Sequence, residues 1–215
     1  MSEGPIPASE RLNALLSQAG LEPLDPVLAH RFEDYLSLIL RWNARINLTG
    51  TRDENGILSR HFVESIACAR ALPPGIATLL DLGSGAGFPG IPIALCRPEI
   101  AVTLAESQGK KAAFLQEAVR LLEIRTKVFV GRAETLATQF DCVTLRAVER
   151  MPKAVAAAAR LVQRSGWLAL MTTRAELGAL ESCTGPEFCW QQIAKLPGSE
   201  SRIVALGRRQ ISSPV

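Results

Sequence analysis

The chain has 215 residues, of which 47% are hydrophobic and 21% charged, and its net charge at pH 7 is +3. This composition is typical of a folded globular unit with a sizeable core and excludes an intrinsically disordered chain. No apolar stretch approaches the roughly 18 residues that a membrane-spanning helix needs, and residues 1–9 lack the pattern of a secretory signal. We therefore expect a cytoplasmic protein that does not associate with membranes.

Three helices are predicted in the first third of the chain. The first begins at a Ser9 cap and stops at Gly20. The second begins at Asp25-Pro26, where a capping acid precedes a proline that suits the first helical turn, and its apolar residues recur with a 3.6-residue period. The third begins at Asp53 and ends before the Pro73-Pro74-Gly75 segment.

After residue 75, short apolar strands alternate with helical stretches, a pattern that predicts a mostly parallel sheet covered on both faces. We expect seven strands, at residues 77–82, 101–105, 127–130, 142–145, 167–171, 190–195 and 203–206. No helix fits between the last two, so one edge strand is expected to be antiparallel. The predicted organisation is a helical N-terminal region (1–75) and an α/β domain (76–215) that together form one compact unit.

The five cysteines are odd in number and none are spaced C-x-x-C, and the chain has only two histidines. A disulfide framework and a metal site are therefore not expected, and a reducing compartment fits best. Cys142 lies within a predicted strand and is interpreted as a packing residue.

A glycine-rich turn follows the first predicted strand, where ligands bind in open α/β sheets. Glycine allows a tight turn and a close approach to a ligand because it has no Cβ. The spacing Gly85-x-Gly87-x-x-Gly90 matches the dinucleotide pattern, whereas Asp81-x-Gly83-x-Gly85-x-Gly87 is similar to the first motif of S-adenosylmethionine methyltransferases. The carboxylate favours the second interpretation, because it attracts an ammonium and a sulfonium but repels a pyrophosphate. Whether Asp81 contacts the cofactor or only orders the turn stays open.

Two further acids are candidates for cofactor contacts. Glu106 ends the second predicted strand, and an acid there can accept hydrogen bonds from both ribose hydroxyls. Ala133-Glu134 follows the third strand, where we expect the adenine ring. For Glu134 a solvent-exposed side chain without a ligand is the stronger alternative.

Several short motifs are spread along the chain: Trp42-Asn43, Asn47-Leu48-Thr49, Arg60-His61, the run from Gly83 to Pro92, Ser107 with Lys110-Lys111, and Arg146-Ala147. Through them the chain resembles, from about Leu12 to Arg208, the bacterial small-subunit ribosomal RNA guanine-N7 methyltransferases, also called glucose-inhibited division protein B. The resemblance implies a Rossmann-like S-adenosylmethionine methyltransferase fold. It also implies methylation of N7 of one guanine in 16S ribosomal RNA, with S-adenosyl-L-methionine as cofactor.

Residue by residue, the resemblance places cofactor contacts at Gly83, Phe88, Ala133, Glu134 and Arg146. The chain departs from the usual pattern at Glu64 and Glu106, where many relatives have Asp, and at Met171, which replaces a lysine. The two acids preserve the charge. The loss of the lysine removes a plausible contact with RNA.

Guanine N7 carries a free lone pair, so in-line methyl transfer needs no general base, covalent nucleophile or metal. Because N7 must stay free, we expect recognition through the Watson–Crick edge of a base displaced from its stack. Arg146, at the end of the fourth predicted strand, is the best catalytic candidate and can hold the cofactor, a phosphate or O6. We expect Arg146→Ala to reduce methyl transfer and to leave the fold intact.

A basic rim is predicted to contact RNA phosphates. Its members are Arg52, Arg60, His61, Lys110, Lys111, Arg150 and Lys153. For each alone a solvated surface is the alternative, and His61 can equally be a core residue. The expected partner is 16S ribosomal RNA or the small ribosomal subunit, and the protein is expected to be a monomer.

Three other functions stay open on sequence alone. They are a methyltransferase for another RNA or a small molecule, a nicotinamide-dependent dehydrogenase, and an RNA-binding protein without activity. Steep loss of activity with salt distinguishes an RNA enzyme from a small-molecule enzyme. Calorimetry with both cofactors distinguishes a methyltransferase from a dehydrogenase.

Overall fold

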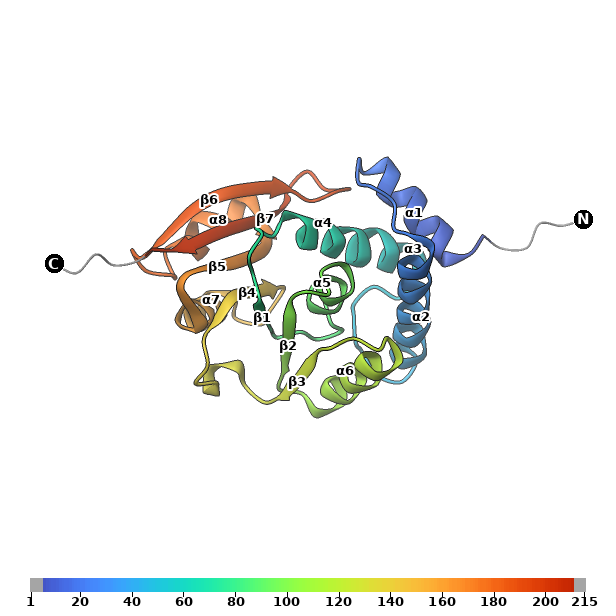
Figure 1. The fold of residues 1–215 in the computed structure, drawn as a ribbon, viewed down its shortest axis with the longest axis horizontal. Helices are drawn as coiled ribbons and strands as arrows, with labels where there is room; N and C mark the ends of the chain where they lie inside the picture. The colour runs from blue at the N-terminus through green and yellow to red at the C-terminus, as the bar shows by residue number, and fades with distance from the viewer. Residues whose placement is uncertain (1–5, 211–215) are drawn as a thin grey trace, which may run out of the picture.

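The computed structural model describes residues 6–210, which form one seven-stranded sheet with helices on both faces (Figure 1). The strands are β1 (Thr78–Leu82), β2 (Ala101–Glu106), β3 (Lys127–Val130), β4 (Phe140–Arg146), β5 (Val162–Thr173), β6 (Phe188–Lys195) and β7 (Arg202–Arg209). Their order across the sheet is β3-β2-β1-β4-β5-β7-β6. The first five are parallel to one another, which confirms the mostly parallel seven-stranded α/β sheet.

The direction in which strands are added reverses between β1 and β4. From β1 the chain builds outward through β2 to β3, and it then returns to place β4 on the other side of β1. At such a switch point the connections leave in opposite directions, so a crevice opens at the carboxyl ends of the two central strands. The fold therefore puts the segments after Leu82 and Arg146 beside one another.

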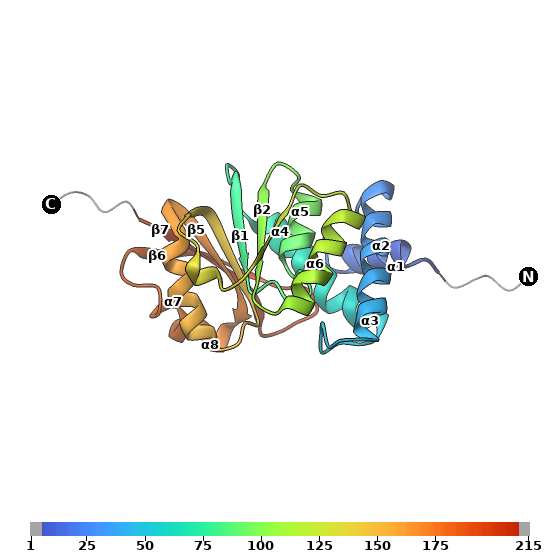
Figure 2. The ribbon, with the colours of Figure 1, turned by 90° about the horizontal axis from the view of Figure 1, so that it is seen from below.

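The helical elements are α1 (Ala8–Gln18), α2 (Pro26–Asn43), α3 (Glu54–Gly56), η1 (Ile57–Phe62), α4 (Val63–Ala71), α5 (Gly90–Cys96), α6 (Gly109–Leu121), η2 (Ala133–Thr135), α7 (Met151–Leu161) and α8 (Arg174–Glu181). Figure 2 shows α4, α5 and α6 on one side of the sheet and α7 and α8 on the other. Alternate residues of β1 belong to two cores. Leu79 belongs to the core that includes residues of α1, α2 and α4–α6, and Leu80 belongs to the core that includes residues of α7 and α8. The N-terminal helices thus share a core with one face of the sheet.

The predicted caps are correct at two of the three N-terminal helices. The Asp25 carboxylate accepts from Leu28 N–H at 3.0 Å, and the Asp53 carboxylate accepts from Gly56 N–H at 2.7 Å. The Ser9 cap is wrong, because α1 begins at Ala8 with Pro7 at the cap position. The Ser9 hydroxyl instead donates to Glu33 at 3.1 Å, so a contact between two helices displaced the local cap.

Two other predictions need correction. The expected single helix after Asp53 contains a π-helical stretch, η1, before the α-helix resumes in α4. The antiparallel strand is not at the edge: β7 lies between β5 and β6 and is antiparallel to both. The sequence also did not predict α8, whose Thr173 cap and Glu176 form a capping box.

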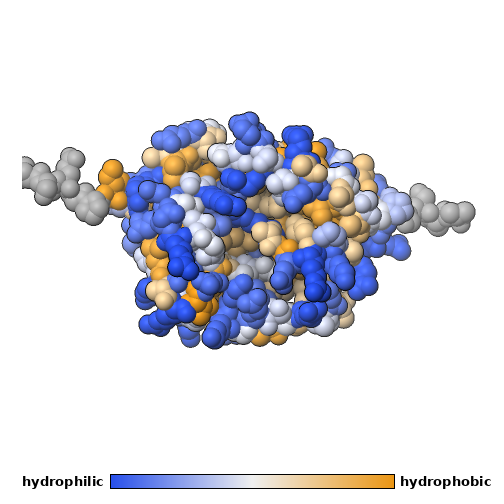
Figure 3. Space-filling view, turned by 180° about the vertical axis from the view of Figure 1, so that it is seen from behind, coloured by the Kyte–Doolittle hydropathy of each residue, from blue (hydrophilic) through white to orange (hydrophobic). Residues whose placement is uncertain are grey.

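The surface offers no single broad apolar face in the view of Figure 3. Hydrophilic residues cover most of that side, and apolar residues appear in several small patches. Among residues 6–210, the helices are too short or too polar to cross a bilayer.

Candidate functional site

Three glycines of the turn after β1 have left-handed backbone conformations, with φ of +72° at Gly83, +56° at Gly85 and +88° at Gly87. A Cβ on Gly83 would lie 3.0 Å from the Val148 side chain. Gly87 needs its bare backbone for packing, because a Cβ there would lie 2.6 Å from the Tyr35 hydroxyl oxygen. Gly83 and Gly85 line the crevice, whereas Gly87 lies behind it.

Asp81 lies beneath the turn and not in the crevice. Its side chain is buried, one carboxylate oxygen accepts from the Thr144 hydroxyl at 2.8 Å, and the other accepts from Gly90 N–H at 3.2 Å. Burial raises the pKa of Asp81 to about 6. Of the two roles considered for Asp81, this geometry supports ordering of the turn.

The crevice consists of two adjoining cavities at the carboxyl ends of β1, β2 and β4. One, of about 530 Å³, is lined by Gly83, Gly85, Phe88, Glu106, Lys111 and Arg146 among others. The other, of about 340 Å³, is lined by Gly131, Ala133, Glu134, Arg150 and Lys153 among others. Gly83, Ser107, Val148 and Glu149 line both, so the two form one elongated site. Seven of the nine predicted cofactor residues line it; Asp81 and Gly87 do not.

Glu106 joins the end of β2 to the glycine turn. Its buried carboxylate accepts from Gly85 N–H at 3.0 Å on one oxygen and from Gln108 N–H at 2.7 Å on the other. These bonds orient the carboxylate at the wall of the larger cavity. Each oxygen has two lone pairs, so both can still accept from a ligand hydroxyl.

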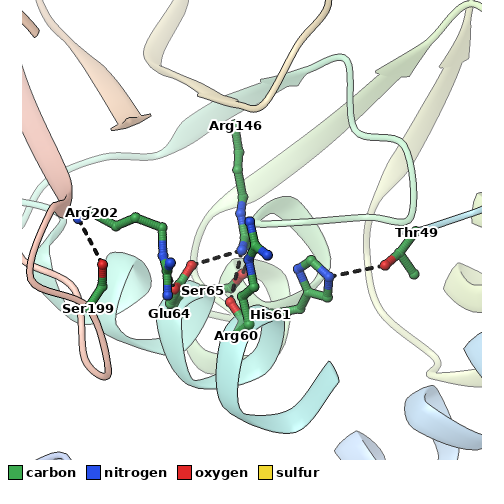
Figure 4. Close-up of polar contacts among 8 residues, drawn as sticks. All are labelled: Thr49, Arg60, His61, Glu64, Ser65, Arg146, Ser199 and Arg202. Atoms are coloured by element: carbon green, nitrogen blue, oxygen red, sulfur yellow. Dashed lines mark hydrogen bonds and ion pairs between the residues drawn. The ribbon is translucent and has the colours of Figure 1, made fainter. Parts of the chain in front are cut away.

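Arg146, at the end of β4, is held by the N-terminal helices (Figure 4). Its guanidinium donates to the Glu64 carboxylate and to the Arg60 carbonyl, each at 2.8 Å, and to the Ser65 hydroxyl at 3.3 Å. The other Glu64 oxygen accepts from Arg202 at 2.6 Å. Burial lowers the pKa of Arg146, and the charge of Glu64 opposes that shift.

The sequence predicted Arg146 as a site residue but did not predict the buried cluster that Glu64 forms with Arg146 and Arg202. Glu64 was noted only as a departure from relatives, and Arg202 was not singled out. Glu64 is 1% exposed, and a buried acid of that kind needs a cation. A charged residue inside the apolar run of a helix was the one signal in the sequence.

His61 stacks on Phe88, with ring centroids 4.9 Å apart and an interplanar angle of 13°. Its Nε2 lies 3.1 Å from the Thr49 hydroxyl, while its buried Nδ1 has no hydrogen-bond partner within residues 6–210. Burial lowers the pKa of His61 to about 3, helped by the charges of Arg146, Arg60 and Arg202. The expected cationic contact of His61 with phosphate is therefore not supported, since the ring is neutral at physiological pH.

The predicted basic rim is only partly assembled around the site. Lys111 lines the larger cavity, and Arg150 and Lys153 line the smaller one. Two of the predicted residues do not line the crevice. Lys110 is exposed at the start of α6, and the Arg52 guanidinium donates to the Asn47 side-chain oxygen at 3.2 Å. Arg60 lines a separate cavity on the far side of Arg146.

A mostly parallel sheet with a ligand crevice over a glycine turn is the arrangement of Rossmann-like folds, which include the methyltransferases that use S-adenosylmethionine. Among solved structures, the fold is similar to that of a SAM dependent methyltransferase from Aquifex aeolicus, with a TM-score of 0.56, 15% identity, and coverage of 72% of this chain and 93% of that chain. The family model described as GidB, rRNA small subunit methyltransferase G, matches residues 28–190. The chain belongs to this family.

Relatives support the assignment over most of the chain. A "Ribosomal RNA small subunit methyltransferase G" from Xanthomonas oryzae pv. oryzae (strain KACC10331 / KXO85) is 38% identical over 85% of this chain and 89% of its own length. One of the same name from Roseiflexus sp. (strain RS-1) is 44% identical over 60% of this chain and 58% of its own length. The predicted family, enzyme class and cofactor are thereby confirmed.

Proposed function

We propose that this protein transfers the methyl group of S-adenosyl-L-methionine to N7 of a specific guanine in 16S ribosomal RNA. The observation that carries the proposal is the two-part crevice over the glycine turn, found in a chain of the rRNA small subunit methyltransferase G family. The alternative is methylation of another RNA or of a small molecule. The family membership speaks against a dehydrogenase.

The residues of the crevice fit the cofactor. Ala133 and Glu134 line the smaller part, which suits an adenine, and Glu106 lines the larger part with oxygens able to accept from ribose hydroxyls. Gly83 and Gly85 leave room for close approach to the backbone. When bound, S-adenosylmethionine supplies a methyl group on a positively charged sulfur. Asp81 and Gly87 contribute through the shape of the turn.

The chain's own residues orient the reactants and exclude water. Guanine N7 loses no proton on methylation, so the neutral His61 needs no basic role. The stacked rings of His61 and Phe88 instead form an aromatic wall of the larger cavity. Arg146, fixed by Glu64, presents a positive charge at the same wall and can hold O6 or a phosphate. In-line alignment of N7 with the methyl carbon lowers the barrier by placing the reactants in a reactive geometry.

Cations placed around the crevice suit an anionic substrate. Lys111, Arg150 and Lys153 line it, and Arg60 lines the neighbouring cavity. Each cation that neutralises a phosphate makes binding more sensitive to salt. We extend the RNA footprint to Lys110 and to His61 as a stacking surface. The expectation of a monomer stays a prediction.

The test is transfer of labelled methyl from S-adenosylmethionine to small-subunit RNA prepared from cells that lack the modification. We expect the label on N7 of one guanine, and activity that falls steeply with salt. Naked 16S RNA and the assembled subunit are compared in parallel. RNA binding without label transfer would indicate a non-catalytic role, and transfer to a small molecule with no salt dependence would support the alternative.

A further inference from the structure

A third cavity, which we call the Glu176 cavity, lies on the other side of Arg146 from the cofactor crevice. It measures about 340 Å³, at the low end of ordinary ligand pockets. The ends of β4 and β5, the first turn of α8 and the start of β7 form its walls. Arg146, Ala147 and Val148 line both this cavity and the larger part of the crevice, so the two are direct neighbours.

Glu176 lines this cavity with an exposed side chain, and one of its two carboxylate oxygens is fixed by hydrogen bonds. Its Oε2 accepts from the Thr173 hydroxyl at 2.8 Å, the Thr172 hydroxyl at 3.0 Å and Thr173 N–H at 3.4 Å. All three bonds use Oε2, and across residues 6–210 none uses Oε1. The same bonds lower the pKa of Glu176, so the carboxylate is ionised at neutral pH. The capping box of α8 thus leaves a charged acceptor free.

The remaining walls suit a flat, partly polar ring with phosphates attached. Met171 and Leu196 are buried apolar residues on the wall. Both offer an apolar contact surface to a ring. Arg60 and Arg202 add positive charge at the same cavity, which Glu64, the ion-pair partner of Arg202, also lines.

We propose that the Glu176 cavity receives the target guanine and that Glu176 selects it through its Watson–Crick edge. The inference rests on the proposed function and names the base subsite of the same enzyme. Guanine offers donors at N1 and at the 2-amino group on this edge, and Oε1 of Glu176 accepts from them. N7 lies on the opposite side of the purine, toward Arg146 and the cofactor crevice. Adenine presents a lone pair at N1, which the carboxylate repels.

Recognition by Glu176 leaves guanine N7 free, as the methyl transfer requires. Arginine commonly reads guanine through O6 and N7 together, which would block the atom to be methylated. An acid on the Watson–Crick edge discriminates guanine from adenine and leaves N7 free. The target base must leave its stack to reach the cavity, as it does in other enzymes that modify bases.

The decisive variant is Glu176→Gln. Glutamine serves as well as glutamate in a capping box, because its carbonyl oxygen takes the place of Oε2. The free group then changes from an acceptor to an N–H donor. We expect kcat/KM on guanine-containing RNA to fall about 10- to 100-fold, the range for a lost hydrogen bond to a charged group. Cofactor affinity and the unfolding midpoint should stay unchanged. Glu181→Gln, at the other end of α8, is the matched control.

A second substrate makes the test specific. RNA with adenine at the mapped target position is compared with guanine RNA for wild type and Glu176→Gln. We expect the preference for guanine over adenine to fall at least tenfold in the variant, because an amide donor tolerates the adenine N1 lone pair. An unchanged preference, with activity either kept or reduced equally on both RNAs, would overturn the inference. If wild-type protein transfers no methyl to small-subunit RNA, the proposed function fails first.

Discussion

The Arg146 guanidinium lies 2.8 Å from the Glu64 carboxylate, and this buried ion pair ties the end of the central strand β4 to helix α4. Glu64 also pairs with Arg202 at 2.6 Å, at the start of β7. One buried acid thus holds two arginines that line the Glu176 cavity, and Arg146 also lines the cofactor crevice. The N-terminal helices therefore take part in shaping the site.

Removal of Arg146 should cost stability as well as activity. Arg146→Ala leaves Glu64 buried with only Arg202 as a cationic partner. Because a buried charge that loses a partner is destabilising, we expect the free energy of unfolding to fall by about 1–3 kcal/mol or more. The sequence predicted an intact fold, and the structure adds this cost. Urea unfolding and methyl transfer should be measured for Arg146→Ala with and without Glu64→Gln. The double variant should recover stability but not transfer; recovered transfer would contradict a direct role for Arg146.

The Tyr35 hydroxyl should support cofactor binding from a distance. Tyr35 is fully buried on α2 and donates to the Ala86 carbonyl in the glycine turn. Tyr35→Phe leaves that carbonyl without its donor, so we expect the free energy of unfolding to fall by about 1–3 kcal/mol. We also expect weaker binding of S-adenosylmethionine, which calorimetry measures. Phe32→Leu is the control: Phe32 packs on Phe62 in the same helix layer, and its change should lower stability only.

Glu106→Gln should weaken cofactor binding about tenfold or more. Both oxygens of Glu106 accept backbone N–H groups, and an amide replaces one acceptor by a donor. The Glu106 side chain then loses one of its two hydrogen bonds from backbone N–H groups, and a ribose hydroxyl loses a charged acceptor. Calorimetry with S-adenosylhomocysteine measures the change, and unaltered affinity would argue against a ribose contact.

His61 should stay neutral throughout the physiological pH range. Its pKa in the folded protein is about 3, so its labelled ring resonances should not shift between pH 8 and 5. The unfolded chain protonates this histidine near its ordinary pKa of about 6.5, so stability should fall as the pH drops from there toward 3. His61→Gln should show a shallower acid slope of the unfolding midpoint. A resonance that titrates near 6.5 would contradict the assignment.

Lys111→Ala and Arg150→Ala should each weaken RNA binding and reduce the slope of its salt dependence by about one. Both residues line the cofactor crevice. Arg164→Ala is the control, because Arg164 is exposed near the opposite end of β5. Binding is measured by titration at several salt concentrations. If the salt dependence of RNA binding had the same slope for all three variants, the proposed phosphate contacts of Lys111 and Arg150 would be contradicted.

Local patterns sufficed for most elements of the fold. Buried parallel strands appear as short apolar runs, and Asp25-Pro26 marks a helix start because capping depends on adjacent residues. Errors arose where a distant contact decided the outcome. Ser9 bonds to Glu33 instead of capping α1, and the position of β7 inside the sheet depends on pairing with β5.

The sequence by itself determined the family, the cofactor class and the glycine turn, because motif spacing and the succession of strands and helices are encoded along the chain. Only the tertiary structure decided that Asp81 faces inward, that His61 is neutral and that Glu64 joins two arginines. Burial and neighbouring charges set these properties. They arise when residues far apart in sequence pack together, which no local pattern records.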